Sequence, residues 1–63
     1  MKIIEKDLEG ILIHLSKDEI SLITSALGEI PNILDVDDCE TRTGYDLEQF
    51  NELFVLFDLI DDR

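Results

Sequence analysis

The residue types that could do chemistry gather in one acidic segment of this 63-residue chain. The segment reads Asp35-Val36-Asp37-Asp38-Cys39-Glu40 and is the only candidate start of a calcium-binding loop. An EF-hand loop that began at Asp35 would need an oxygen ligand at its fifth place, glycine at its sixth and a bidentate glutamate at its twelfth. Cys39, Glu40 and Asp46 stand at these places. These departures exclude an EF-hand and favour a solvated acidic patch.

Nucleophilic catalysis would depend on His14 and Cys39, the ordinary candidates for it in the chain. His14 falls in a predicted strand and Cys39 in a predicted short helix, and no third residue is placed to orient the pair. A lone cysteine in a helix is usually a small buried hydrophobe, and no Cys/His cluster offers a zinc site. We therefore expect a protein that is not an enzyme and that holds no metal or cofactor.

The segment Thr41-Arg42-Thr43-Gly44-Tyr45-Asp46 joins two predicted helices through a glycine turn, as in a helix-turn-helix unit. The following helix begins Leu47-Glu48-Gln49-Phe50-Asn51-Glu52, which contains no basic residue and two acids. DNA-binding proteins position themselves on phosphates largely through arginine and lysine. A helix of this composition would repel the phosphates, so we expect no nucleic-acid partner.

Charge is the strongest signal in the composition. Sixteen acidic residues stand against five basic ones, which gives a formal net charge of −11 at pH 7. Residues 1–28 hold five acids and three lysines, whereas residues 29–63 hold eleven acids and two arginines. A field of this sign repels nucleic acid and anionic lipid and attracts basic proteins. The composition therefore predicts a basic protein partner, with solubility alone as the simpler explanation.

Nothing in the sequence predicts export or membrane insertion. No stretch approaches the ~20 apolar residues that cross a bilayer. Charged residues also interrupt the N-terminus before the apolar run of a signal peptide could form. The single cysteine rules out an internal disulfide and suits a reducing compartment. We expect a cytoplasmic protein with no membrane contact.

The first element predicted is a β-hairpin over residues 2–15 with Gly10 in its turn. Its second strand places Ile11, Ile13 and Leu15 on one face. We expect that face to pack on the core.

Three helices follow in the prediction. Ser16 and Glu19 match a capping box at the start of the first helix, which should end near Ile30 because proline follows. A second helix is predicted over Val36–Thr43, with Asp35 as N-cap and Gly44 as a left-handed stop; the third starts at about Asp46 and includes Gln49 in its first turn. The chain is thus predicted to be a single α+β domain over residues 1–63, in which the hairpin packs against two or three short helices.

The third helix carries more apolar surface than a hairpin and one helix can cover. This surplus predicts a second contact surface, which would be used either in a homodimer formed through the C-terminal helix or in a partner. The residues concerned are Leu53, Phe54, Val55, Leu56, Phe57, Leu59 and Ile60.

A candidate partner-binding surface surrounds the turn after the second helix. Five carboxylates bracket that turn and its aromatic residue; the set is Asp35, Asp37, Asp38, Glu40, Tyr45 and Asp46. Tyr45 could be an exposed anchor or a core residue, and both readings stay open. Arg42 is expected to pair with a neighbouring carboxylate and fix the bend, with a contact role as the alternative.

Three motifs are similar to those of a family of very short bacterial proteins. They are Leu15-Ser16-x-Asp18-Glu19-Ile20, Ala26-Leu27-x-Glu29-Ile30 and Glu40-Thr41-Arg42-Thr43-Gly44-Tyr45. The chain resembles, over residues 10–54, immunity proteins of contact-dependent growth inhibition and related polymorphic toxin systems. The resemblance implies a small cytosolic inhibitor that neutralises a toxin domain, frequently a nuclease.

Charge and resemblance lead to the same hypothesis. A nuclease is basic where it grips phosphate, so an acidic inhibitor can occupy its cleft in place of the substrate. The sequence thus predicts an immunity protein that blocks a basic nuclease toxin, an RNase in the first instance. The alternatives are a DNA-mimic inhibitor of a DNA-binding protein and a homodimeric protein-interaction module.

Overall fold

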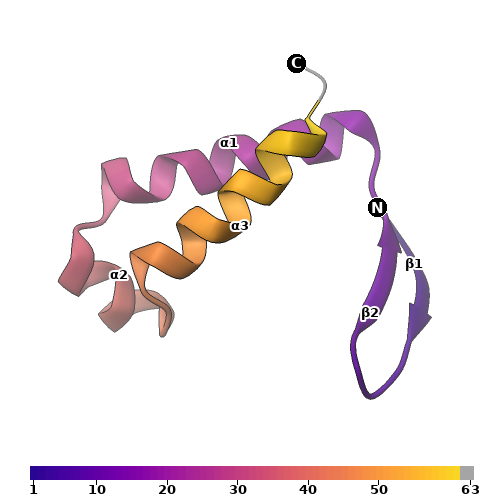
Figure 1. Cartoon of the computed structure of the whole chain (residues 1–63), viewed down its shortest axis with the longest axis horizontal. Helices are drawn as coiled ribbons and strands as arrows, with labels where there is room; N and C mark the ends of the chain where they lie inside the picture. The colour runs from indigo at the N-terminus through magenta and orange to yellow at the C-terminus, as the bar shows by residue number, and fades with distance from the viewer. Residues whose placement is uncertain (62–63) are drawn as a thin grey trace.

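A two-stranded hairpin followed by three helices makes up residues 1–61, the part of the chain that the computed structural model describes (Figure 1). The elements are β1 (Lys2–Lys6), β2 (Ile11–His14), α1 (Lys17–Ile33), α2 (Val36–Thr43) and α3 (Leu47–Ile60). The predicted α+β class is therefore confirmed.

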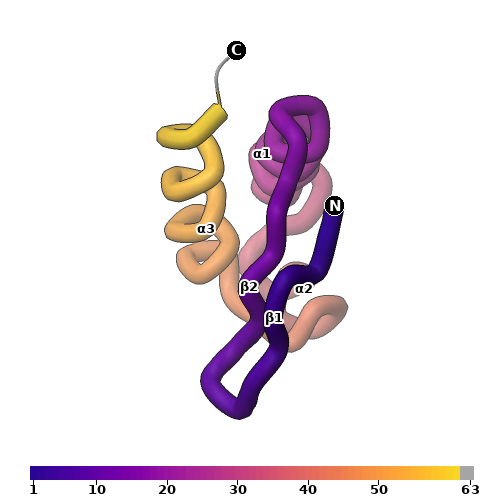
Figure 2. The backbone as a smooth tube through the Cα atoms, turned by 90° about the vertical axis from the view of Figure 1, so that its right-hand side faces the viewer, coloured from indigo at the N-terminus to yellow at the C-terminus, as the bar shows by residue number. Residues whose placement is uncertain are grey.

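Helices α1 and α3 lie against each other and form the body of the molecule, and α2 closes one end of the pair (Figures 1 and 2). They run in opposite directions, because the end of α3 returns to the start of α1. At that end the Ser21 hydroxyl donates to Asp61 Oδ1 at 2.7 Å. Farther along, a Cβ atom at Gly28 would stand 3.1 Å from Cε1 of Phe54, so the helices approach closely where α1 has no side chain.

Helix α1 begins as predicted but ends later. The capping box is present: the Ser16 hydroxyl accepts from the Glu19 N–H at 3.1 Å, and Glu19 Oε1 accepts from the Ser16 N–H at 2.9 Å. The predicted end near Ile30 is wrong, because the helix includes Pro31 and continues to Ile33. Pro31 lies in the last turn, where its missing N–H removes a single bond, and the Leu34 N–H still donates to the Ile30 carbonyl at 2.9 Å.

The hairpin turn is built by an aspartate more than by its glycine. Asp7 Oδ1 accepts from the N–H groups of Glu9 and Gly10 at 2.8 and 3.0 Å, and the Asp7 N–H donates to the Gly10 carbonyl at 2.9 Å. Gly10 does not adopt a left-handed conformation. The side chain of Asp7 thus supplies the bonds that hold a short polar turn.

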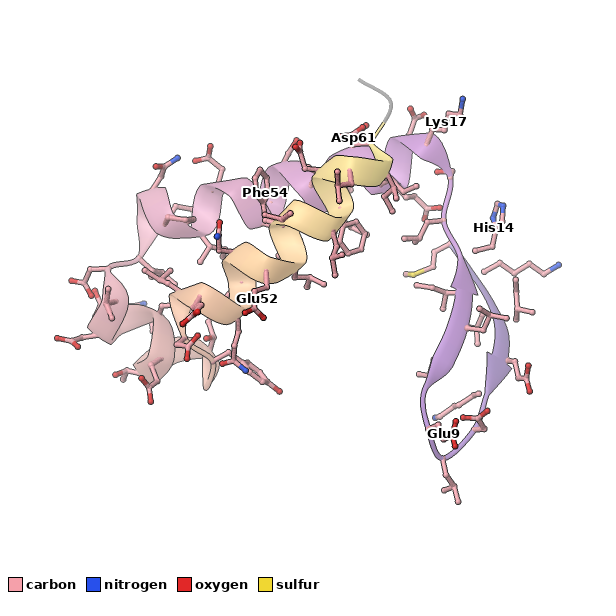
Figure 3. The ribbon with its side chains drawn as sticks, viewed as in Figure 1. Glu9, His14, Lys17, Glu52, Phe54 and Asp61 are labelled. Atoms are coloured by element: carbon pink, nitrogen blue, oxygen red, sulfur yellow. The ribbon has the colours of Figure 1, made fainter. Side chains whose placement is uncertain are left out.

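The hairpin does not pack on the core, so this part of the prediction is wrong. All residues of β1 and β2 are exposed, including Ile11 and Ile13, and the hairpin hangs from one end of the helix pair (Figure 1). Figure 3 shows His14 on the side turned away from the helices. Strand alternation therefore turns Ile11 and Ile13 toward the side of the helices, where both remain exposed.

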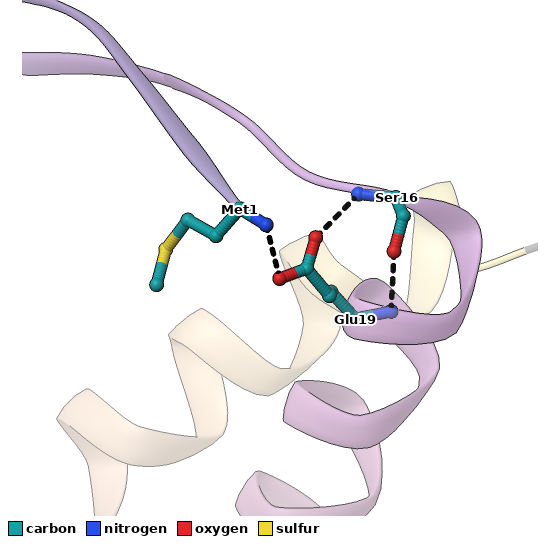
Figure 4. Close-up of polar contacts among 3 residues, drawn as sticks. All are labelled: Met1, Ser16 and Glu19. Carbon is teal, nitrogen blue, oxygen red and sulfur yellow. Dashed lines mark hydrogen bonds and ion pairs between the residues drawn. The ribbon is translucent and has the colours of Figure 1, made fainter.

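The direction of the hairpin is set at its junction with α1. The Glu19 carboxylate that completes the capping box also binds the N-terminal ammonium group of Met1 (Figure 4). These bonds lower the pKa of Glu19 to about 2, the ammonium group contributing most and the Ser16 N–H next. The start of β1 is thereby held at the first turn of α1, and the strands extend beyond the helix pair.

The core of residues 1–61 is thin. Only Cys39 and Thr24 are buried in this part of the chain, with Thr24 donating its hydroxyl to the Ile20 carbonyl at 2.7 Å. The molecule measures 35 × 32 × 15 Å, which makes it a flat body with a projecting arm. Domains normally bury their apolar faces between two packed layers, and here the second layer is largely missing.

Candidate partner-binding surface

Acidic residues crowd the start of α2. Asp35 is the N-cap: its Oδ1 accepts from the Asp38 N–H at 2.8 Å, and its carbonyl accepts from the Cys39 N–H at 2.9 Å. Asp37 and Asp38 occupy the first turn, where the helix dipole stabilises negative charge. All three carboxylates are exposed, so they stabilise the helix and remain available to a partner.

The turn after α2 is organised by Gly44 and by the hydroxyl of Thr43. Gly44 has φ +82° and donates its N–H to the Glu40 carbonyl at 2.9 Å, which is the left-handed stop that the sequence predicts. The Thr43 hydroxyl donates to the Cys39 carbonyl at 2.6 Å and accepts from the Tyr45 N–H at 3.1 Å. The buried Cys39 thiol lies 3.4 Å from the Tyr45 carbonyl. These bonds fix the backbone that presents Tyr45.

Asp46 begins α3 with a second capping box. Its Oδ1 accepts from the Gln49 N–H at 2.8 Å, and Gln49 Oε1 accepts from the Asp46 N–H at 3.0 Å. The predicted start of the third helix is confirmed. Asp46 therefore has a structural task, yet its side chain stays exposed.

The structure divides the predicted surface into two parts. Asp35, Asp37 and Asp38 lie at the start of α2, whereas Tyr45 and Asp46 follow its end. An eight-residue helix is ~12 Å long, so the N-cap Asp35 and the turn at Gly44 lie about that far apart. The sixth predicted residue, Glu40, is exposed between them. The carboxylates thus form an acidic edge along α2 and not a single cluster around Tyr45.

Arg42 does not pair with a neighbouring carboxylate, so the ion pair expected to fix the bend is wrong. Over residues 1–61, the ion pair within 4.0 Å joins Met1 to Glu19, at the other end of the molecule. Arg42 lies in the last turn of α2, where its positive charge suits the helix dipole. Gly44 and Thr43 make the bend without it.

An apolar pocket opens beside Tyr45. It has a volume of about 240 Å³ and is lined by Tyr45, Gln49, Phe50 and Leu53. Tyr45 is 57% exposed and meets Phe50 edge to face, with ring centroids 6.4 Å apart and planes at 88°. The exposed reading of Tyr45 is the one that the structure supports.

Sequence reasoning missed the other residues that line the pocket. The sequence places Gln49 in the first turn of the third helix and Leu53 on its apolar face, and it indicates no pocket at Phe50. Leu53 follows Gln49 by four residues and Phe50 by three. Residues with these spacings share a helix face, so the sequence does indicate that the three side chains lie together. Tyr45 lies beside that face because of the turn at Gly44 between α2 and α3, and the spacing of residues along the chain does not predict this.

Other kinds of site find no geometric support in the described residues. Across residues 1–61, no group of three acidic, histidine or cysteine side chains is placed to hold a metal ion. His14 belongs to the hairpin and Cys39 to α2, at opposite ends of the molecule, so they do not form a catalytic pair (Figure 1). No helix in this part of the chain has the length and apolar character needed to cross a bilayer.

Comparison with protein-family models, with curated proteins and with solved structures found no match for the chain.

Proposed function

We propose that this chain is a cytoplasmic immunity protein that binds a basic toxin domain, most simply an RNase, and neutralises it without catalysis. The acidic edge along α2 would lie where the nuclease holds RNA phosphates. Complementary fields speed such an association, which matters for an inhibitor that must capture each toxin molecule before it acts.

The observation that carries the proposal is the exposure of the carboxylates on α2 without basic partners. Asp35, Asp37, Asp38 and Glu40 are all exposed, and within residues 1–61 none lies in an ion pair. Unpaired acids packed along one short helix repel each other, and a basic partner relieves that repulsion. The edge is therefore favourable for a cationic cleft and unfavourable for nucleic acid.

The pocket beside Tyr45 adds an apolar contact to this charged edge. Binding energy at interfaces is concentrated in a few anchors, among which tyrosine is frequent. Tyr45 follows the end of α2 and precedes Asp46, and its side chain forms one wall of the pocket. A partner side chain in the pocket would give the complex a slow dissociation that charge attraction alone does not provide.

A charge reversal on α2 tests the proposal. The double variant Asp37→Lys/Asp38→Lys should bind the toxin domain more slowly and with a weaker dependence on salt, because rim charges act mainly on association. Binding is measured by surface plasmon resonance at low and high salt, against the C-terminal domain of the protein encoded directly upstream. Co-expression gives the matching readout of protection.

Asp18→Lys is the matched control. Asp18 is also an exposed first-turn acid, on α1, so the variant carries the same type of helix-dipole cost, about 0.3–1 kcal/mol per charge. Asp18→Lys changes the charge by two units and the double variant changes it by four. After correction for this difference, Asp18→Lys should associate with the toxin domain as fast as wild type does. Equal rates and salt slopes for wild type and the α2 variant would reject α2 as the binding surface. Tight binding to a DNA-binding protein and not to a nuclease would favour the DNA-mimic alternative.

A further inference from the structure

The chain exposes far more surface than a folded monomer of its mass. Its accessible area is 5286 Å², whereas a monomer of 7.2 kDa exposes about 4,100 Å². Its radius of gyration is 13.3 Å, against about 10.6 Å for a compact domain of this length. The excess of about 1,200 Å² is of the size that one protein buries in a complex, since a standard interface takes about 800 Å² per partner.

One exposed apolar face belongs to α3. Phe54 points at α1, because its ring lies against Gly28. Figure 3 shows Glu52 at the edge of α3 that is turned away from α1, on the side from which the hairpin hangs. Leu56 follows Glu52 by four residues and therefore shares that side of the helix. Leu56 and Ile60 continue from Leu53 at helical spacing, and all three side chains are exposed. We call Leu53, Leu56 and Ile60 the inner stripe.

A second exposed apolar face belongs to the hairpin. Ile3 pairs with Ile13 across the two strands, and Ile11 shares their face by alternation. His14 lies on the opposite face, which Figure 3 shows turned away from the helices. The isoleucine face therefore looks toward the side of the inner stripe, yet all three isoleucines remain exposed. The isoleucine face and the inner stripe are thus both apolar and exposed, and each could bury the other.

We propose that a second copy of the chain supplies both covers. The hairpin of each copy lies with Ile3, Ile11 and Ile13 on the inner stripe of the other, around a two-fold axis. In such an isologous contact the same two surfaces are used twice, so one pairing covers the isoleucine face and the inner stripe of both copies. This inference does not depend on the proposed function of α2, although the two surfaces share Leu53, which also lines the pocket beside Tyr45.

Size supports a second copy as the occupant. β2 has four residues and is ~13 Å long, and the inner stripe spans seven residue steps, ~10 Å. The two faces thus match in length. Two such contacts in a dimer would cover surface on both the hairpin and the helices, and the excess of about 1,200 Å² is large enough to supply them.

Charge also supports a second copy over a basic partner at this place. In the hairpin, two lysines nearly balance the three acids Glu5, Asp7 and Glu9, whereas residues 35–61 hold nine acids and Arg42 alone. The hairpin is therefore the part of an acidic chain that approaches α3 with the least repulsion. The residues of the inner stripe are apolar, and the exposed Glu52 lies beside them. The stripe matches an apolar, nearly neutral surface, and the hairpin is one.

Complementary charge variants test this pairing. Wild type should sediment at twice 7.2 kDa at ~50 µM. Ile13→Lys on the hairpin and Leu56→Glu on the stripe should each raise the dissociation constant of the dimer about 30-fold or more, as the loss of an interface anchor does. An equimolar mixture of the two should dimerise again, because it forms one native contact and one Lys–Glu contact. Leu22→Glu is the matched control and should leave the dimer intact.

The control is placed by helix geometry. Leu22 is exposed on α1 and stands two residues, about 200°, from the buried Thr24. It therefore lies on the outer side, away from the proposed contact. Circular dichroism confirms that each variant keeps its helices before its mass is compared. A monomeric wild type, a dimer that survives Ile13→Lys, or a dimer lost in Leu22→Glu would overturn the proposal.

A cross-link gives a second measurement that does not rely on charged variants. Ile13→Cys/Leu56→Cys, made in a Cys39→Ala background, should form disulfides between copies on oxidation and run as a covalent dimer without reductant. A disulfide within one chain would show that the hairpin folds back on its own α3 and would overturn the exchange. No cross-link in a folded protein would do the same.

Discussion

Gly28 sets the distance between α1 and α3. A Cβ atom at this position would lie 3.1 Å from the ring of Phe54, which is closer than such atoms normally approach. Glycine in a helix costs about 1 kcal/mol relative to alanine, and the sequence alone suggests only that it weakens the last turns of α1. In the structure this cost is offset, because the absence of a side chain at Gly28 lets the Phe54 ring pack directly on the backbone of α1.

Gly28→Val should therefore destabilise the protein although valine is the better helix former. The added methyl groups push Phe54 away, and overpacking of this kind costs about 1–3 kcal/mol. Urea unfolding of wild type and variant measures the difference. Ala26→Val, at an exposed position of the same helix, should cost only about 0.5 kcal/mol. If Gly28→Val were at least as stable as wild type, Gly28 would not limit the approach of the helices.

At the scale of elements, the junction between the hairpin and α1 rests on Glu19. Its carboxylate caps α1 through the Ser16 N–H and binds the Met1 ammonium group, and both bonds favour the ionised form. They lower the pKa of Glu19 from 4.5 to about 2. A carboxyl whose pKa is lowered by folding stabilises the folded state above its unfolded pKa, and this contribution is lost as the pH falls toward the folded pKa.

The stabilisation from Glu19 should accordingly be complete above about pH 4.5 and disappear between pH 4.5 and pH 2. Glu19→Gln removes the titrating group, so the difference in melting temperature between wild type and variant should shrink across that window. Melting curves recorded at half-unit steps of pH give the comparison. Glu29→Gln, an exposed site on the same helix, serves as control. A difference for Glu19→Gln that stays constant down to pH 2 would argue against the two bonds.

At the scale of the whole molecule, two buried residues are a small core for 61 described ones. A domain of about 60 residues is already marginal when it buries ~60% of its surface. This chain buries less as a single copy, because its hairpin and the inner stripe face an open side. Association of two copies would convert that exposed apolar area into stability, so unfolding of the wild type would be coupled to dissociation of the dimer.

The melting temperature should then rise with protein concentration. For a dimer that unfolds to two chains, a tenfold increase adds about 1.4 kcal/mol per mole of dimer, which corresponds to about 5 °C for this chain length. Differential scanning calorimetry between ~10 and ~500 µM measures the shift. Leu56→Glu, which removes the contact, should melt at a temperature independent of concentration. A wild type with the same independence would contradict coupled folding.

The sequence determined the elements that depend on neighbouring residues. A cap forms between side chains and N–H groups within a few positions, so Ser16 with Glu19, Asp46 with Gln49, and Gly44 each mark a helix end that the sequence alone predicts correctly. The same locality explains the one wrong boundary. Pro31 predicts an end of α1 at Ile30, but in a last turn proline removes a single bond, which leaves the helix free to continue.

Only the tertiary structure decided where the faces of these elements point. Ile11 and Ile13 of β2 are predicted to be core residues. Strand alternation correctly predicts that they share a face, but the sequence of a strand does not specify which surface that face will contact. The carboxylates near α2 are predicted to surround one turn, and the helix distributes them along its length. The pocket forms because the turn at Gly44 places Tyr45 against the face of α3 that carries Phe50. Spacing along the chain fixes directions within an element, whereas contacts between elements depend on turns and on distances in space, which a linear pattern does not contain.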